Sequence, residues 1–259
     1  MIAPSHLSLA LPGRPCRSAW ARWSFALAVL ALLAWTGAAH AKGPLVILDP
    51  GHTAKLPGAM SVRGRTEVDY NDAFVALLAS KLTAAGFEVA LTRKPGEELT
   101  LGARAKKVNE RKPWLLLSIH HDSAQLVYLH EEKQGGATVY RTTRPIRGYS
   151  LFISGSNASH ARSVDVAKAL GRKILALGRP PTLHHEEPIP GEGRPLLDRK
   201  LGIYRYDDLK VLKQVTCPAV LLEVGVLVDE ADEAYVSDPV HQEAIAGAIV
   251  DALVELRGK

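Results

Sequence analysis

Two histidines and two glutamates occupy places in this sequence from which they could share a metal ion. His52 and His120 each follow an apolar segment of strand length. Glu67 begins a segment of helical periodicity, and Glu223 lies within another apolar segment. Two imidazoles and one carboxylate leave a fourth coordination position open, which is the usual arrangement around a catalytic zinc ion. The second carboxylate is then available as a general base.

Each of these residues also has an ordinary structural interpretation. A histidine in a turn, such as His52, is commonly a polar loop residue, and a glutamate at a helix N-terminus, such as Glu67, is commonly stabilised by the helix dipole. Glu223 is harder to explain in this way, because a carboxylate within an apolar strand is costly unless it is paired or functional. A structural salt bridge is its main alternative. Each residue taken singly is weak support for a metal, but together the set favours one.

His120 is followed directly by a second histidine, His121. Successive side chains of a strand point to opposite faces of the sheet. One of the two can therefore face the site while the other packs or is solvated. This pattern alone does not decide which histidine is the ligand.

Strands and helices alternate along the chain and would position these residues. Apolar segments of strand length lie at residues 45–48, 87–92, 114–119 and 219–222, with a shorter one at 137–140. Helical periodicity follows Thr66 and Thr100, and recurs at residues 167–177 and from Pro239 onward. This alternation predicts one α/β domain with a mostly parallel central sheet flanked by helices on both faces. Ligands of such sheets bind beyond the carboxyl ends of the strands, where the candidate residues lie.

Several residues mark where the helices begin and end. Thr66 is the expected N-cap of the first helix, with Asp69 completing a variant of the capping box, and Gly86 is expected to end that helix. Asp238 is the expected N-cap of the last helix, with Pro239 in its first turn.

Two segments, residues 141–160 and 178–203, have the composition of loops. The second of them contains His184-His185-Glu186-Glu187. The composition there favours a solvated loop over a second metal site.

Residues 1–41 have the pattern of a secretory signal peptide. They contain three arginines and no acidic residue, followed by an apolar run of 11 residues and then Ala39-His40-Ala41. The run is shorter than the ~20 residues that span a bilayer. The expected mature domain is therefore residues 42–259, without a stable membrane anchor after signal cleavage, in the periplasm or secreted.

Composition limits the remaining possibilities. The chain of 259 residues is 47% hydrophobic and 23% charged, which is typical of a globular protein. Without residues 1–41 it keeps 29 basic and 27 acidic residues, a net charge of +2, so nothing indicates a nucleic-acid partner. Cys217 is the one cysteine outside residues 1–41, and we expect it to be a small buried apolar residue.

A series of short motifs resembles, in order, the zinc-dependent N-acetylmuramoyl-L-alanine amidases. Each motif alone is loose, but the ordered set is specific and runs from about residue 45 to 255. The motifs are Val46-Ile47-Leu48-Asp49-Pro50-Gly51-His52, Gly58-Ala59, Glu67, Leu91-Thr92-Arg93, Leu101-x-x-Arg104-Ala105 with Asn109, Ser118-Ile119-His120 and Leu221-Leu222-Glu223-Val224-Gly225.

The resemblance implies a role for each candidate residue. His52, Glu67 and His120 would bind Zn²⁺, and Glu223 would be the catalytic acid/base. The substrate would be peptidoglycan, at the amide between N-acetylmuramic acid and L-alanine. The chain departs from the family pattern at Asp122, where Asn is usual, and after Gly225, where Phe and then Asn are usual. These departures concern expected substrate contacts and not the metal ligands.

Two other functions are compatible with the same residues. One is another zinc peptidase or hydrolase on a similar fold, and the other is a catalytically silent module that binds the cell wall. The presence of all four candidate residues favours an enzyme over a silent module. The sequence does not identify a protein activator.

Overall fold

The core of the molecule is a seven-stranded sheet in the order β2-β1-β3-β9-β6-β8-β7. The computed structural model describes residues 43–258. Four of the six strand pairings are parallel, which confirms the predicted α/β class with a mostly parallel sheet. The strands are β1 (Leu45–Pro50), β2 (Glu88–Leu91), β3 (Leu115–Asp122), β6 (Ser150–Ile153), β7 (Leu196–Asp198), β8 (Ile203–Arg205) and β9 (Ala219–Val226).

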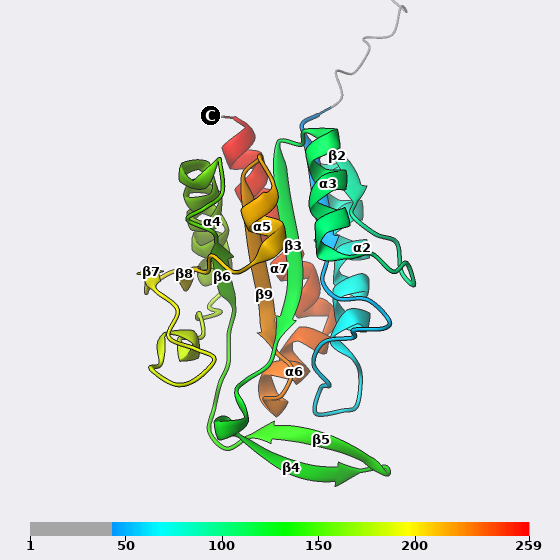
Figure 1. The fold of residues 1–259 in the computed structure, drawn as a ribbon, viewed down its shortest axis with the longest axis vertical. Coiled ribbons are helices and arrows are strands. Elements are labelled where there is room, and N and C mark those ends of the chain that lie inside the picture. The colour runs from blue at the N-terminus through cyan, green and yellow to red at the C-terminus, as the bar shows by residue number, and fades with distance from the viewer. Residues whose placement is uncertain (1–42, 259) are drawn as a thin grey trace, which may run out of the picture. The chain divides into compact units, whose positions relative to one another are not determined.

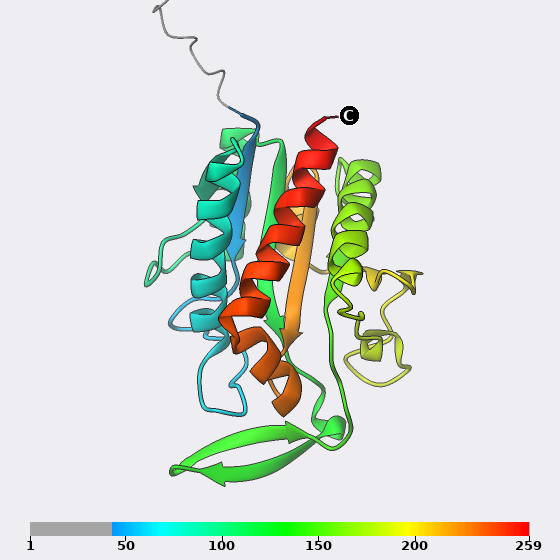
Figure 2. The same cartoon turned by 180° about the vertical axis from the view of Figure 1, so that it is seen from behind.

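Helices cover both faces of this sheet, as predicted. Figure 1 shows α3 (Leu101–Arg111) and α5 (Lys210–Gln214) on one face. Figure 2 shows α2 (Glu67–Ala84), α4 (His160–Ala176) and α7 (Pro239–Arg257) on the other. The shorter α6 (Glu230–Ser237) follows β9, and the hairpin of β4 (Leu129–Gln134) and β5 (Ala137–Thr142) projects from the end where β3 and β9 finish. Single 3-10 turns lie at Leu126–Tyr128 and His184–Glu186.

The alternation of side chains along the strands divides the core into two layers. Val46 and Leu48 of β1 pack into the cluster that contains α2, α4 and α7 residues, whereas Ile47 packs into the cluster on the α3 and α5 side. The same alternation runs through β3 and β9. Continuous apolar strands arise because both faces of the sheet are covered.

The helix ends follow the expected signals with one difference. Gly86 has a φ of 85° and closes α2, and the side chain of Asp238 accepts from the backbone N–H of Val240 at the start of α7. The Thr66 side chain makes no capping bond to the backbone. Its hydroxyl instead donates to Asp69 Oδ2 at 2.6 Å, so the predicted capping box is wrong in its bonding although α2 starts where expected.

The two segments predicted to be loops contain part of the regular structure. Strand β6 and the first residue of α4 lie within residues 141–160, and β7 and the His184–Glu186 turn lie within 178–203. The strands there have only three or four residues, which is too short for periodicity to reveal. The central sheet is therefore wider than the sequence indicated.

No helix within residues 43–258 is long and apolar enough to cross a membrane. The predicted signal peptide, residues 1–41, lies outside the described residues.

Candidate metal centre

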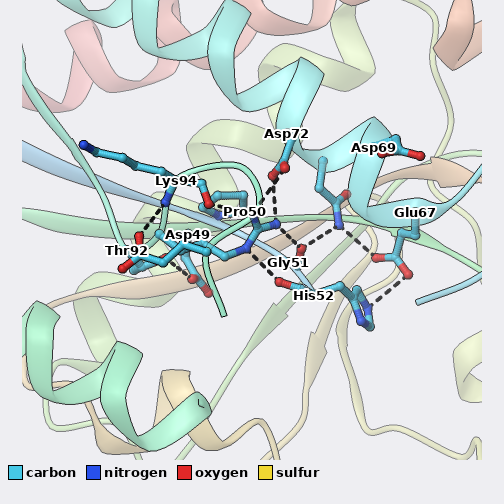
Figure 3. A network of polar contacts seen from close by, with 12 residues as sticks. Asp49, Pro50, Gly51, His52, Glu67, Asp69, Asp72, Thr92 and Lys94 are labelled. Atoms are coloured by element: carbon cyan, nitrogen blue, oxygen red, sulfur yellow. Dashed lines mark hydrogen bonds and ion pairs between the residues drawn. The ribbon is translucent and has the colours of Figure 1, made fainter. Parts of the chain in front are cut away.

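Three of the predicted site residues meet at the carboxyl ends of β1 and β3. Glu67, the first residue of α2, lies between the two imidazoles: His52 Nε2 is 3.0 Å from its Oε2, and His120 Nδ1 is 3.0 Å from its Oε1. One donor atom from each residue lies within 4.8 Å of the other two. Figure 3 shows His52 and Glu67 directed toward each other from the loop after β1 and the start of α2.

Glu67 is held ionised by its surroundings. Its side chain is buried, and it accepts hydrogen bonds from Asn71 Nδ2 (3.2 Å) and the backbone N–H of Ala59 (3.1 Å). Burial by itself raises the pKa of a carboxyl. The hydrogen bonds and charges of His120 and His52 outweigh burial here and hold the pKa of Glu67 well below its usual range.

The His52 ring presents Nε2 to the cluster because its other nitrogen is occupied. His52 Nδ1 lies 3.1 Å from the carbonyl oxygen of Leu56. Burial lowers the pKa of His52, but its hydrogen bond and charge interaction with Glu67 raise it above the usual value overall. A ring fixed through Nδ1 is the arrangement that orients histidine ligands in metal sites.

Two buried arginines hold the backbone that carries His52. The φ of His52 is 63°, a left-handed conformation that is uncommon for a residue other than glycine. Arg93 Nε donates to the His52 carbonyl at 2.7 Å, and Arg104 Nη2 donates to the same oxygen. Arg93 also donates to the Gly51 carbonyl and Arg104 to the Pro50 carbonyl. The Asp49–Gly51 part of this network appears in Figure 3.

The neighbouring histidine faces the other side of the sheet. His121 is buried, packs near the rings of Tyr70 and Phe74, and shares a 2.8 Å hydrogen bond between its Nδ1 and Asn71 Oδ1. Burial lowers the pKa of His121 to about 3, so the ring is neutral. His120 is thus the histidine of the pair that joins the cluster.

Glu223 lies beside the cluster on the adjacent strand. It is paired with His120 in the parallel register of β3 and β9. Its Oε2 atom is buried and has no hydrogen-bond partner among the described residues. Burial, followed by the negative charges of Asp122 and Glu67, raises the pKa of Glu223 well above its usual value. The structural salt bridge considered for Glu223 is not formed within residues 43–258.

A pocket of about 220 Å³ opens next to Glu223. Asp122, His185, Glu192 and Arg194 contribute to its lining, which does not include the three ligand candidates. Glu223 therefore lines the pocket and also lies next to His120 in the sheet.

Several residues that support the cluster have no role predicted from the sequence. Asn71 lies one helical turn after Glu67 and contacts both Glu67 and His121. Arg93 and Arg104 appeared only as motif residues. Besides the motifs, the sequence offered one signal, a basic residue within or beside an apolar segment, because a guanidinium that becomes buried there requires several acceptors.

The predicted solvated loop around His184 and His185 is also wrong. Both histidines are buried and face Asp122 at the end of β3. The cause is a contact across 63 residues, which local composition cannot indicate.

The donor set of the first cluster fits a zinc ion. Ligands bound at 2.0–2.1 Å in a tetrahedral site lie about 3.3 Å apart, and the observed ligand-to-ligand separations of 3.0 Å are close to this spacing. Two imidazole nitrogens and one carboxylate leave a coordination position open for water or substrate.

The chain is similar to known proteins over most of its length. The Amidase_3 family model, described as N-acetylmuramoyl-L-alanine amidase, matches residues 46–255. The chain is 26% identical over 214 residues to "Probable cell wall amidase LytH" of Staphylococcus epidermidis, covering 82% of this chain and 58% of that protein. It is 24% identical over 235 residues to N-acetylmuramoyl-L-alanine amidase AmiC of Neisseria meningitidis, covering 83% of this chain and 53% of that protein. The chain thus spans little more than half the length of these curated relatives.

Solved structures show the same fold. The catalytic domain of CwlV, an N-acetylmuramoyl-L-alanine amidase from Bacillus (Paenibacillus) polymyxa var. colistinus, is 27% identical with a TM-score of 0.60 over 82% of this chain and 97% of that chain. Ami1 of Mycobacterium smegmatis, at 22% identity, has a TM-score of 0.65 over 83% and 97% of the two chains. Because the family model spans most of the chain, this protein belongs to the N-acetylmuramoyl-L-alanine amidase family.

Proposed function

We propose that this protein is a zinc-dependent amidase that hydrolyses the bond between N-acetylmuramic acid and L-alanine in peptidoglycan. The observation that carries the proposal is the convergence of His52, Glu67 and His120 in a chain of this family. These three residues would hold the ion. A bound zinc ion lowers the pKa of water to about 7 and polarises a carbonyl oxygen.

Proton transfer and the positioning of the ligands would fall to other residues of the chain. Glu223, on the strand next to His120, would take a proton from the attacking water and deliver it to the leaving amine. A carboxyl group with a raised pKa is suited to such a transfer. Arg93 and Arg104 would keep the His52 backbone in position.

We further propose that the protein acts outside the cytoplasm, in the periplasm or after secretion. The signal pattern in residues 1–41 supports export, and the substrate lies outside the cytoplasm. Curated relatives carry the name cell wall amidase. Peptidoglycan is the proposed partner, with no nucleic acid and no stable membrane anchor after signal cleavage.

Incubation of the purified protein with cell-wall sacculi tests the proposal. Mass analysis should find peptides with free L-alanine amino termini and intact sugar chains, and a chelator should abolish their release. Cleavage between amino acids of the peptide would instead identify a zinc peptidase. Binding to sacculi without any product in the presence of zinc would identify a silent wall-binding module.

A further inference from the structure

A second cluster of residues able to hold a metal ion borders the pocket beside Glu223. Asp122 from the end of β3 meets His184 and His185 from the 3-10 turn. His185 Nε2 lies 2.8 Å and His184 Nε2 lies 3.5 Å from Asp122 Oδ2. One donor atom from each residue lies within 4.8 Å of the other two, as in the first cluster.

Outer contacts orient both rings toward the same carboxylate oxygen. His184 Nδ1 is 2.9 Å from the hydroxyl of Thr182, and His185 Nδ1 is 3.0 Å from Glu192 Oε2. Both Nε2 atoms are consequently directed at Asp122. A carboxylate or hydroxyl behind each ligating imidazole is the usual outer contact of a histidine metal site.

The ion pair between His185 and Asp122 leaves one buried nitrogen of the cluster without a hydrogen bond within residues 43–258. His184 is 3% exposed, and its Nε2 is buried without a hydrogen bond in the described chain. A buried polar atom left in this state destabilises the folded protein. A cation among the three side chains would provide the missing partner for this nitrogen.

We propose that Asp122, His184 and His185 bind a second divalent cation of the zinc class. The separations of 2.8 and 3.5 Å lie on either side of the ligand spacing of a tetrahedral zinc site, about 3.3 Å. Two imidazoles with one carboxylate favour zinc over calcium or magnesium, which prefer oxygen ligands.

The pocket would give this ion an open coordination position. Asp122 and His185 line the same pocket as Glu223, so an oxygen of a bound molecule could reach the ion from there. The site shares no ligand with His52, Glu67 and His120, and its occupancy does not depend on the proposed hydrolysis.

Zinc binding by the purified protein tests this inference without an activity assay. Equilibrium dialysis with elemental analysis should give two equivalents of zinc for the unaltered chain. The count should fall to one in Asp122→Asn and in His184→Gln. It should remain two in the control Glu186→Gln, which changes a carboxylate of the same turn that pairs with exposed Arg199.

A variant lacking the first site separates the two clusters. His52→Ala combined with His120→Ala should still bind one equivalent, and X-ray absorption of that zinc should show two imidazole ligands. Saturation of the unaltered chain at one equivalent would overturn the inference. So would loss of all zinc from the double variant, or a second equivalent that persists in both Asp122→Asn and His184→Gln.

Discussion

Glu223 combines a position next to a candidate metal ligand with a carboxylate oxygen that no described residue satisfies. It is paired with His120 in the register of β3 and β9, and its buried Oε2 lacks a hydrogen-bond partner within residues 43–258. A carboxylate in such surroundings destabilises the folded protein, so its presence calls for a role other than stability. Proton transfer in the proposed reaction provides that role.

Replacement of this carboxyl should separate metal binding from turnover. We expect Glu223→Gln to keep its zinc and to lower kcat on sacculi by about 10²- to 10⁴-fold, the usual contribution of a general acid or base. Glu110→Gln, on the exposed surface of α3, serves as the control and should leave the rate unchanged. A near-normal rate for Glu223→Gln would remove this residue from the mechanism.

The adjacent histidines of β3 should respond to substitution in opposite ways. His120→Ala should reduce bound zinc, measured by elemental analysis, because its ring joins Glu67 in the cluster. His121→Ala should keep zinc but lower the free energy of unfolding by roughly 2–4 kcal/mol, because it removes a buried ring and its bond to Asn71. Zinc loss in His121→Ala alone would show that the register assigned to β3 is wrong by one residue.

The junction after β1 and the start of α2 together set the position of the cluster. Glu67 and Asn71 lie four residues apart on α2 and so share one face of that helix. Gly51 brings the chain against β3, with its N–H donating to the Ile119 carbonyl at 2.9 Å. A Cβ atom on Gly51 would overlap the His120 ring.

Addition of that methyl group should therefore disturb the metal site more than the fold. We expect Gly51→Ala to weaken zinc binding roughly 10- to 100-fold, as other changes to the groups that orient metal ligands do. Gly247→Ala is the matched control, because its added methyl group would meet open space in the interior of α7. It should stabilise the protein by about 1 kcal/mol without changing zinc affinity. Equal zinc affinity in the two variants would contradict this account of Gly51.

A cysteine in the layer between the sheet and α5 can serve as a probe of cooperative unfolding. Cys217 is a buried free thiol that packs with Val211, Leu212 and Val215, as the sequence predicted for a small apolar residue. Burial raises the pKa of Cys217 to about 11. The thiolate that reacts with alkylating reagents is thus scarce at pH 8, and the sulfur is inaccessible.

Alkylation of Cys217 should accordingly report the opening of the domain. We expect the peptide that contains Cys217 to remain unmodified by iodoacetamide at pH 8 in buffer, and to react across the same denaturant range in which the far-ultraviolet circular dichroism is lost. Mass spectrometry of the digested protein measures the reaction. Rapid modification without denaturant would mean that this layer opens locally.

Much of the fold was predictable because periodicity and caps are properties of neighbouring residues. The apolar segments placed β1, β2, β3 and β9, and strand alternation implied that only one of His120 and His121 could face the site. The strands β6, β7 and β8 were missed because three or four residues carry too little pattern.

Contacts between distant segments could not be obtained in this way. Local patterns placed His52, Glu67 and His120 at strand and helix ends and Glu223 within a strand, and the family resemblance supplied their expected roles. The burial of His184 and His185 against Asp122, and the support of the His52 backbone by two arginines, arise from packing. Helix caps and hydrophobic periodicity involve only a few neighbouring residues of the chain. The mutual placement of side chains tens of residues apart is set instead by how the layers pack together, which short-range patterns do not encode.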